Sequence, residues 1–458
     1  MTKINRFNVK RIDHAGMDPH LLPFAERQAP RYTSYPSANH FDASVDAGLY
    51  RRWLSALENA TSLSLYLHVP YCRQLCWYCG CNTFLTRGGD IGDFVTTLMM
   101  EMDLVASALG SRTVNEVHWG GGTPNVLSAA EFLRIVHHID FWFDLRPDMK
   151  HAIELDPRYI TPELAQAYAA AGVGRVSLGV QDLNTHVQEA IGRIQPFDQV
   201  REGVRILREA GLKEVSFDLI YGLPRQSAGD LARSIRLASE LRPNRIALFG
   251  YAHVPWFKRR QRLIDASALP GANERFDQAE LAGRMLNDLG YMSIGLDHFA
   301  RADDPLAKAA QEGKLHRNFQ GYVAEASQAI IGFGPSAISH LPGGYAQNIS
   351  TIGAWRHAVE ANTLPVSRGH AESAEDLRRG AVIQSIMCNF EVDLRPWGGW
   401  DMFPEAHAEL RPFVEAGLIE THGDVLLVPP AARQFSRLVA MAFDAYGQSS
   451  PLAHSRAV

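Results

Sequence analysis

The chain has 458 residues, 46% of them apolar and 21% charged, a composition typical of a globular protein that excludes a fibrous or wholly disordered one. The length exceeds that of one ordinary core and favours two or three packed units, one with room for a barrel of about 250 residues. The formal charge of −5 provides no field that would hold a polyphosphate chain, so no nucleic-acid partner is expected.

The sequence shows neither a membrane span nor a secretory signal. It contains no run of about 18 or more apolar residues, and its N-terminus lacks the apolar stretch of a signal peptide. We therefore expect a cytoplasmic protein without membrane insertion. Four of the five cysteines, Cys72, Cys76, Cys79 and Cys81, fall within ten residues, and Cys388 lies far from them. In a reducing compartment such crowding favours metal or redox chemistry over disulfides.

The arrangement of apolar runs predicts the fold class. Residues 1–60 lack sustained periodicity and are interpreted as an extended N-terminal arm with one short helix. From residue 61, short β-rich runs alternate with helical stretches, which predicts a parallel sheet with crossover helices. A six-stranded partial barrel fits better than a closed eight-stranded one. The predicted strands span 64–69, 114–119, 151–155, 175–180, 214–220 and 245–251.

Local residue patterns predict where several helices begin and end. Gly110 is placed to end a helix with an apolar face from residue 94 to 109. Ser128 with Glu131 forms a capping box for the next helix. Thr161 before Pro162 is a cap followed by proline at the first helical position.

The remainder of the chain is predicted to extend the barrel and then to become mainly helical. Residues 252 to about 360 show mixed structure, and a barrel with its extension is expected over 61–365. Residues 366–458 are mainly helical and end in the order helix, two-stranded hairpin, helix, which resembles a winged helix. A small domain that packs over the barrel is preferred to a DNA-binding module, because no basic stripe accompanies the second helix. The expected fold is therefore α/β, a partial (βα)6 barrel with an N-terminal arm and a winged-helix-like C-terminal domain.

The segment HVPYCRQLCWYCGCNTF, residues 68–84, carries the most specific chemistry. It follows a buried strand, so it lies at the carboxyl end of that strand, where α/β sheets place active sites. Cys72, Cys76 and Cys79 have the spacing C-x3-C-x2-C, and thiolates suit both iron–sulfur clusters and zinc. Structural zinc needs four protein ligands, and Cys81 follows Cys79 too closely to complete a tetrahedron. Three cysteines on a [4Fe-4S] cluster would leave one iron open for a substrate or cofactor.

These residues resemble a known superfamily. C-x3-C-x-aromatic-C after the first strand of a partial barrel is similar to the radical S-adenosylmethionine (SAM) superfamily. The wider sequence resembles one of its families, the oxygen-independent coproporphyrinogen III oxidases. That likeness covers almost the whole chain, through PRYTSYP, HWGGGTP, IELDPR, LGVQD, FDLIYGLP, YAHVP, LDHFA, HRNFQGY, GPSAIS and CNF, and through the C-x-C extension at Cys81.

The resemblance implies an oxidoreductase of porphyrin and haem biosynthesis, with one [4Fe-4S] cluster and two molecules of SAM. A 5′-deoxyadenosyl radical from SAM would convert two propionates of coproporphyrinogen III to vinyl groups, with loss of CO2, giving protoporphyrinogen IX. A low-potential electron donor and an electron acceptor are also implied, and a monomer is expected. The cofactor performs the difficult step and the protein positions it.

The resemblance also assigns residues to these ligands. Cys72, Cys76 and Cys79 would hold the cluster. Glu154 would contact the first SAM, and Gln181, Arg193 and Asp218 a second one, at successive strand ends. Glycines let backbone polar groups approach a ligand closely, and the turn after the second strand would hold the methionine end of SAM. The remaining expected SAM contacts, with that turn included, are Tyr66, Tyr78, Gly121, Gly122, Thr123, Ala252 and Ile338.

Two further groups have less specific assignments. Cys81 is expected near the site, as a catalytic residue or a free thiol rather than a ligand, and Cys388 is expected in the core. The four propionates of the substrate call for cationic partners, and arginine is the usual carboxylate clamp. Arg31, Arg301 and Arg317 are the candidates.

Two alternatives remain open at this point. A haem-binding chaperone of the same superfamily would share the barrel, but this chain has the N-terminal PRYTSYP segment and, at 345–355, YAQNISTIGAW without the histidine of the haem motif. A zinc or DNA-binding regulator built on the C-terminal pattern is opposed by the acidic charge balance and by the glycine-rich strand end.

Overall fold

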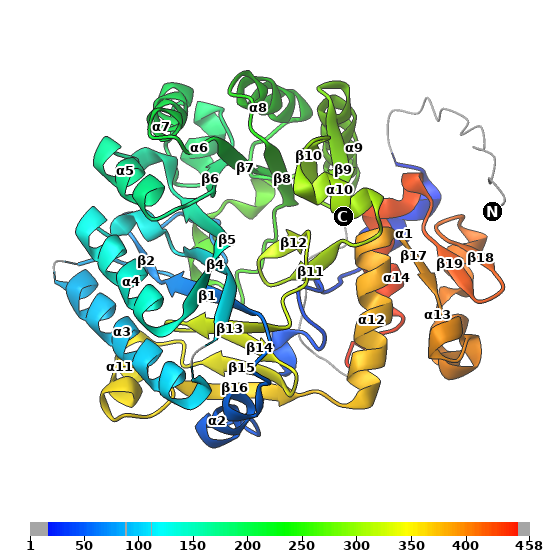
Figure 1. Cartoon of the computed structure of the whole chain (residues 1–458). Helices are drawn as coiled ribbons and strands as arrows, with labels where there is room; N and C mark the ends of the chain where they lie inside the picture. Colours follow the sequence, from blue (N-terminus) through cyan, green and yellow to red (C-terminus); the bar gives the residue numbers. More distant parts are fainter. Residues whose placement is uncertain (1–16, 88, 111, 448–458) are drawn as a thin grey trace.

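The computed structural model describes residues 17–87, 89–110 and 112–447. Its main feature is a curled sheet of twelve strands within that part of the chain (Figure 1). Seven neighbouring strands run parallel. In spatial order they are β13 (Ala329–Phe333), β1 (Leu63–Val69), β4 (Thr113–Gly121), β5 (Asp144–Leu155), β6 (Arg175–Gln181), β7 (Glu214–Tyr221) and β8 (Arg245–Gly250).

The six predicted strands are therefore confirmed, and they lie side by side in chain order. The seventh parallel strand, β13, comes from the predicted extension and pairs with β1 through Leu63 and Ala329. Antiparallel strands extend the sheet at both edges. They are β10 (His298–Arg301) and β9 (Tyr291–Ile294) beyond β8, and β14 (Ile338–Leu341), β15 (Gly344–Asn348) and β16 (Val366–Ala371) beyond β13.

The burial pattern along a strand shows which residues face the apolar core and which face the barrel interior. In β1 six of the seven residues are buried, as expected for a parallel strand that is covered on both faces. In β6, buried and half-buried residues alternate, so one face packs against helices and the other faces the interior. The residues on that interior face are Arg175, Ser177, Gly179 and Gln181.

Helices cover the outer face of the barrel (Figure 1). The predicted caps are confirmed: Ser128 and Glu131 form a capping box, Thr161 accepts a hydrogen bond from Leu164 N, and Gly110 ends its helix. The helices of the barrel and its extension are α3 (Asp90–Leu109), α4 (Ala129–Trp142), α5 (Pro162–Ala170), α6 (Thr185–Ala190), α7 (Phe197–Glu209), α8 (Ala228–Glu240), α9 (Ala272–Asp288), α10 (Pro305–Gln311) and α11 (Ile352–Glu360). None of the described helices is long and apolar enough to span a bilayer.

The N-terminal arm contains two α-helices among its described residues, α1 (Leu22–Ala25) and α2 (Ala47–Ala56), where one was expected. The arm connects two cores. Residues from Met17 to Tyr35 pack in the C-terminal core, and residues from Val45 to Leu57 pack in the barrel core. The hydroxyl of Tyr32 donates a hydrogen bond to Asp444 over 3.0 Å.

The C-terminal module begins with α12 (Ala374–Asn389), which stands between the barrel and the remainder of the module in Figure 1. The predicted order of helix, hairpin and helix is confirmed, and a third strand, β17 (Glu391–Asp393), pairs with the hairpin. The other elements are α13 (Pro404–Glu415), β18 (Glu420–His422), β19 (Val425–Leu427) and α14 (Ser436–Met441).

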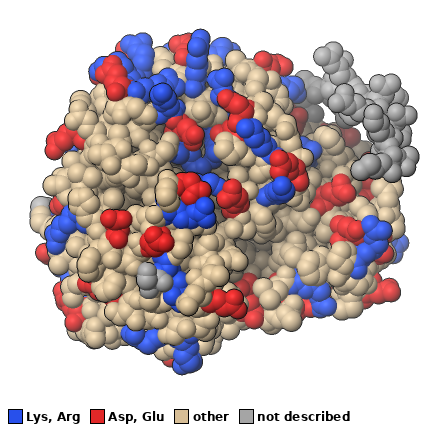
Figure 2. Space-filling model, in the orientation of Figure 1, with Lys and Arg blue, Asp and Glu red and all other residues tan. Residues whose placement is uncertain are grey.

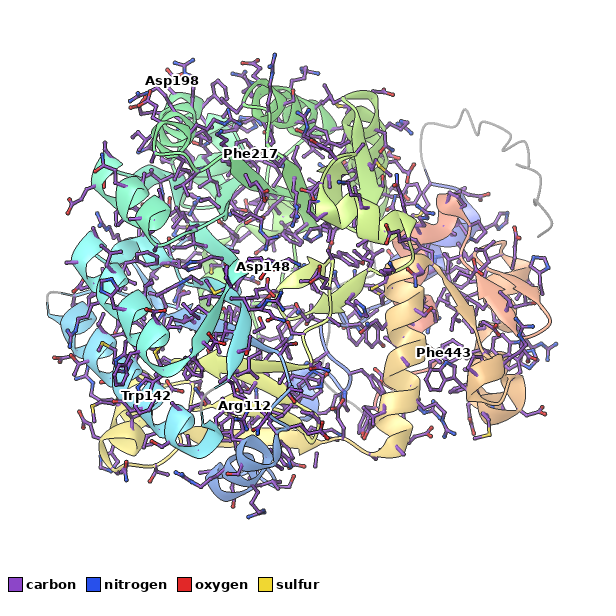
Figure 3. The ribbon with its side chains drawn as sticks, in the orientation of Figure 1. Arg112, Trp142, Asp148, Asp198, Phe217 and Phe443 are labelled. Atoms are coloured by element: carbon purple, nitrogen blue, oxygen red, sulfur yellow. The ribbon has the colours of Figure 1, made fainter. Side chains whose placement is uncertain are left out.

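Two apolar cores organise the molecule. Phe217, in β7, belongs to the barrel core, and Phe443 belongs to the C-terminal core; both are fully buried and labelled in Figure 3. Figure 2 shows basic and acidic side chains interspersed over the face in view, the C-terminal module included. Two small sheets, β2 (Tyr71–Cys72) with β3 (Phe84–Leu85) and β11 (His316–Asn318) with β12 (Gly321–Val323), complete the fold.

Candidate active site

The cysteine loop leaves the carboxyl end of β1 and is closed at its base by the parallel pairing of β2 with β3. Cys76 is buried, Cys72 and Cys79 are half-buried, and Cys81 is exposed. These four residues line one cavity of about 200 Å³. In the described part of the chain, no three His, Cys, Asp or Glu side chains form a single-ion site. The three thiols of the C-x3-C-x2-C spacing instead surround a shared space, which fits a multi-iron cluster.

The chemistry of the thiols supports this fit. Burial, followed by the proximity of Cys79 and Cys76, raises the pKa of Cys72 to about 12. Crowded thiols of this kind become thiolates when a metal centre supplies positive charge. A hydrogen bond from the side chain of Cys81 is the largest cause that lowers the pKa of Cys79, to about 6. Cys81 therefore contacts a candidate ligand, which agrees with a place beside the cluster.

A buried ion-pair network contacts the cysteine loop at Cys76. Nη1 of Arg193 lies 3.4 Å from Sγ of Cys76 and 3.2 Å from Oδ2 of Asp156. Arg158 contacts the same carboxylate oxygen at 2.6 Å. Burial alone would raise the pKa of Asp156, but Arg193 and Arg158 hold it below its ordinary value. Asp156 thus stays ionised and fixes the guanidinium that contacts the thiol.

The glycine-rich turn at the end of β4 packs directly on the cysteine loop. A Cβ atom at Gly122 would lie 2.4 Å from the carbonyl oxygen of Tyr71. The backbone N–H groups of Gly122 and Thr123 donate to the carbonyls of Val69 and Tyr71 over 2.7 and 2.9 Å. Gly121, Gly122 and Thr123 also line the thiol cavity. The turn is therefore packed closely on the cysteine loop and lines the thiol cavity, and its contact with the methionine end of SAM stays a prediction.

The predicted strand-end residues meet at the same cavity. Glu154 of β5, Gln181 of β6 and Asp218 of β7 line it together with Arg193 and Tyr78. Gln181 has φ +65°, a left-handed conformation that is uncommon outside glycine and that clusters at functional sites. Burial, and then repulsion from Glu154, raises the pKa of Asp218 to about 7.

A larger cavity of about 560 Å³ adjoins the first inside the barrel. The two cavities share Cys81, Gly121, Glu154 and Asp218 among their lining residues. Tyr66 and Ile338, both expected SAM contacts, line the larger one, as do Arg31 and Arg317. The structure therefore brings the expected cluster, SAM and substrate residues to two adjoining spaces, the larger of which extends inside the barrel to the starts of β6 and β8.

Two expected residues do not line these cavities. The carbonyl of Ala252 accepts a hydrogen bond from Gln261 Nε2, which also donates to the carbonyl of Tyr78, so Ala252 adjoins the loop through Gln261. Arg301 has an exposed side chain that lies outside both cavities. It ends β10, which runs antiparallel to β8, so this end lies where the parallel strands begin. There Arg301 forms an ion pair with Asp303 over 3.7 Å, and the structure does not bring it to the site.

Several residues that the structure places at the site were not singled out in the sequence. Asp156 lies in the IELDPR segment, two residues beyond Glu154, but its pairing with Arg193 joins residues 37 apart. His118 donates to or accepts from Glu154 over 2.9 Å. Arg175 and Arg245, at the starts of β6 and β8, line the larger cavity. Alternation with buried residues in β6 could have identified Arg175 as interior, but β8, in which three buried residues follow Arg245, gives no such pattern.

Comparisons with known proteins agree with this geometry. The family model described as the Radical SAM superfamily matches residues 66–238. The chain is 43% identical over 444 residues to an oxygen-independent coproporphyrinogen III oxidase of Bradyrhizobium diazoefficiens, covering 95% of this chain and 99% of that one. It is 36% identical over 448 residues to the Escherichia coli protein of the same name, covering 96% and 97%.

A solved structure has the same fold. The structure titled coproporphyrinogen III oxidase (HemN) from Escherichia coli, described as a radical SAM enzyme, superimposes with a TM-score of 0.86 at 34% identity. The match covers 92% of this chain and 100% of that one. Identity at this level, over nearly the full length of the relatives, shows common family membership. The chain belongs to the oxygen-independent coproporphyrinogen III oxidases of the radical SAM superfamily.

Proposed function

We propose that the chain decarboxylates two propionate groups of coproporphyrinogen III oxidatively and without oxygen, giving the vinyl groups of protoporphyrinogen IX in porphyrin and haem biosynthesis. One observation carries the proposal: the thiol cavity adjoins a larger cavity that is lined by arginines. A radical source and a carboxylate-binding space are thus neighbours. The activity is that of the family, whose members use a [4Fe-4S] cluster and SAM.

In this proposal Cys72, Cys76 and Cys79 hold the cluster and leave one iron for SAM. The cluster held there would supply one-electron reductive cleavage of SAM, and hence the means to abstract hydrogen from a propionate β-carbon. The protein keeps this chemistry apart from water. Trp77 and Tyr78 of the cysteine loop pack against an apolar cluster that includes Ile191, Leu223 and Ile264.

The polar strand ends would bind SAM in two positions. Glu154 and the glycine turn of residues 121–123 serve the first, with Tyr66, Tyr78 and Ile338 beside them. Gln181, Arg193 and Asp218 serve the second, with Ala252 nearby. The raised pKa of Asp218 supports this assignment, because a carboxyl that is half protonated near neutral pH can donate or accept a hydrogen bond at a ribose hydroxyl. No single residue indicates two SAM sites. The support for two sites is that these polar groups line one cavity together.

Arg31 and Arg317 are proposed to bind substrate carboxylates. Both line the large cavity and also an adjoining cavity of about 310 Å³ between α9, the arm and the C-terminal module. The Arg317 side chain is 5% exposed, and its Nη1 has no hydrogen-bond partner among the described residues. Its nearest carboxylate, Asp297, is 3.8 Å away. A buried guanidinium with an unused donor is suited to a carboxylate ligand.

The remaining parts of the proposal concern organisation and partners. We propose an N-terminal arm at 1–60, a barrel with its extension at 61–365 and a C-terminal domain at 366–458. Because β16 (Val366–Ala371) still pairs with β15 in the barrel sheet, and the C-terminal core resumes within α12, the two apolar cores support a boundary between β16 and α12 rather than at residue 365. We propose a cytoplasmic monomer, since ligand thiolates require a reducing compartment. An electron donor and an electron acceptor complete the reaction, and neither nucleic acid nor membrane insertion has a part in it.

The test is anaerobic incubation of the full chain with SAM, dithionite and coproporphyrinogen III, followed by mass analysis of the porphyrin. The expected product has lost two molecules of CO2. As a control, the same incubation without SAM should leave the substrate unchanged. Stable binding of added haem, with no decarboxylation by iron-loaded protein, would contradict the proposal and favour a haem-binding paralogue.

A further inference from the structure

A segment just beyond β8 exposes large apolar side chains next to the cysteine loop. Trp256 is 56% exposed, Phe257 67% and Leu263 59%. Large apolar side chains that are this exposed and close in sequence mark interaction sites more often than isolated ones do. Phe257 and Lys258 also pack together, with Nζ of the lysine 5.1 Å from the ring centroid. We call residues 256–263 the Trp256–Leu263 surface.

The same surface is strongly basic. Residues 256–263 contain Lys258, Arg259, Arg260 and Arg262, and no acidic residue occurs from 252 to 264. The whole chain has a formal charge of −5, so this segment has a charge of the opposite sign to that of the chain as a whole. Arg259 and Arg262 are exposed and have no ion pair among the described residues. A field of one sign on a surface steers a partner of the opposite sign.

This surface is fastened to the cysteine loop. Nη2 of Arg260 donates to the carbonyl oxygen of Thr83 over 2.7 Å, and Nη1 donates to the hydroxyl of the same residue over 3.1 Å. Gln261 Nε2 donates to the carbonyl of Tyr78 over 2.8 Å. Beneath the surface, Ile264 belongs to the apolar cluster on which Tyr78 packs. The exposed segment is therefore the outer layer of the loop that carries Cys72, Cys76 and Cys79.

We propose that the Trp256–Leu263 surface docks a small acidic protein that carries single electrons and reduces the cluster. The inference rests on the proposed function, which requires one electron for each SAM that is cleaved. In each encounter the carrier is oxidised by one electron and the cluster is reduced by one electron, with no bond made or broken in this step. The exposed aromatic residues would form the apolar centre of the contact and the arginines its charged rim.

The charge and position of the surface favour this occupant over others. An apolar centre with a basic rim complements an acidic protein surface. A nucleic acid or an anionic membrane would also be attracted by positive charge, but neither can deliver electrons to the loop beneath. These two occupants become outcomes of the test: tighter binding to anionic lipid vesicles or to DNA than to the acidic carrier would overturn the proposal.

Binding is measured first, independently of turnover. The probe is a purified flavodoxin, a small acidic flavoprotein, titrated into the full-length iron-loaded protein in calorimetry at low and high salt. The test variant is Arg259→Glu/Arg262→Glu, and its matched control is Arg51→Glu/Arg52→Glu. The control reverses two exposed arginines of α2, which lies beside β16 at the far edge of the sheet (Figure 1).

We expect the test variant to bind flavodoxin about tenfold or more weakly at low salt, with a reduced salt dependence, and the control variant to bind like the unmodified protein. Trp256→Ala should weaken binding with little change in salt dependence, because it removes apolar contact rather than charge. Equal affinities for the Arg259→Glu/Arg262→Glu variant and its control would overturn the proposal.

Turnover then separates this inference from the proposed function. With dithionite as reductant, the test variant should match the unmodified protein, since a small anion needs no docking surface. With flavodoxin as reductant, its SAM cleavage should fall about tenfold. Absence of decarboxylation in the unmodified protein with dithionite would refute the proposed function itself. Normal flavodoxin-driven cleavage in the variant would refute only the docking surface.

Discussion

The guanidinium of Arg193 contacts both the thiol of Cys76, at 3.4 Å, and the carboxylate of Asp156, at 3.2 Å. Arg193 follows β6, Cys76 follows β1 and Asp156 directly follows β5, so the segments that leave three strands meet in one contact. The guanidinium of Arg193, fixed at the thiol of a proposed cluster ligand, is positioned to affect both the cluster and the bound SAM. Its removal should therefore impair the reaction without removing the thiol ligands.

For Arg193→Ala we predict retained iron and vinyl formation lowered about 10- to 100-fold, as for other residues that orient metal ligands. The measurements are iron content and product formation under anaerobic conditions. Arg158→Ala is the comparison variant, because Arg158 pairs with Asp156 and donates a hydrogen bond to Gln74 of the loop, whereas the hydrogen bond to Cys76 comes from Arg193. An equal loss in both variants would show that Asp156, rather than the contact with the thiol, carries the effect.

The cysteine variants should divide into two groups. Cys72→Ser, Cys76→Ser and Cys79→Ser should each lose the brown chromophore and all SAM cleavage, since each removes a cluster ligand. Cys81→Ser and Cys388→Ala should keep the iron, because Cys81 is predicted to lie near the cluster without binding it and Cys388 is buried in α12, in a separate apolar cluster. Iron and sulfide analysis after anaerobic reconstitution distinguishes the groups. Turnover by any variant of the first group would show that its cysteine is not a ligand.

Two glycines near the cluster loop should respond oppositely to substitution. A Cβ at Gly122 would meet the backbone of Tyr71 at 2.4 Å, whereas a Cβ at Gly80 would meet nothing within 4 Å. Gly122→Ala should therefore lower the free energy of unfolding by about 1–3 kcal/mol and reduce iron incorporation. Gly80→Ala should preserve both. Thermal unfolding and iron content test this contrast, and a Gly122→Ala protein with unchanged stability and iron would contradict the packing described for the turn.

Asp218 should make stability depend on pH. Burial, followed by repulsion from Glu154, raises its pKa to about 7 against an ordinary value of 3.8, while Ser177 and Arg193 oppose the shift. A carboxyl with a raised pKa binds its proton more tightly in the folded state, so its contribution is complete below about pH 4 and is lost as the pH rises through 7.

Asp218→Asn cannot ionise and should escape this loss. Without SAM, we predict that the variant is more stable than the unmodified protein at pH 8 by roughly 1–4 kcal/mol, with the advantage shrinking toward pH 5. Urea unfolding at several pH values measures it. Parallel stability curves for the two proteins would show that Asp218 is ionised in the fold at all these pH values.

Local patterns were sufficient for much of the fold and the site. The six predicted strands contain apolar runs separated by helices, so the residue pattern located them, although β5 begins at Asp144, ahead of its predicted start at 151. Four of the five cysteines lie within ten residues of one loop. Glu154, Gln181 and Asp218 could be brought together from sequence because the carboxyl ends of parallel strands share one edge of a sheet.

The parts that sequence did not predict depend on contacts between distant residues. Neither the insertion of β13 beside β1 nor the pairing of Asp156 with Arg193 leaves a local pattern. Arg301 was expected at the substrate because its motif is shared with the family. β10 runs antiparallel to β8, so Arg301 lies where the parallel strands begin, and its exposed side chain pairs with Asp303 instead of lining the cavity. The direction of a strand in a sheet is set by its tertiary partners, and sequence alone did not reveal it.

Hydrogen abstraction from the substrate is the central claim, and isotope transfer tests it most directly. The full-length, iron-loaded protein is incubated anaerobically with SAM, dithionite and coproporphyrinogen III that carries deuterium at the propionate β-carbons. The account predicts deuterium in the recovered 5′-deoxyadenosine, together with a porphyrin that has lost two molecules of CO2. Unlabelled 5′-deoxyadenosine, formed while the substrate keeps all four carboxylates, would contradict it.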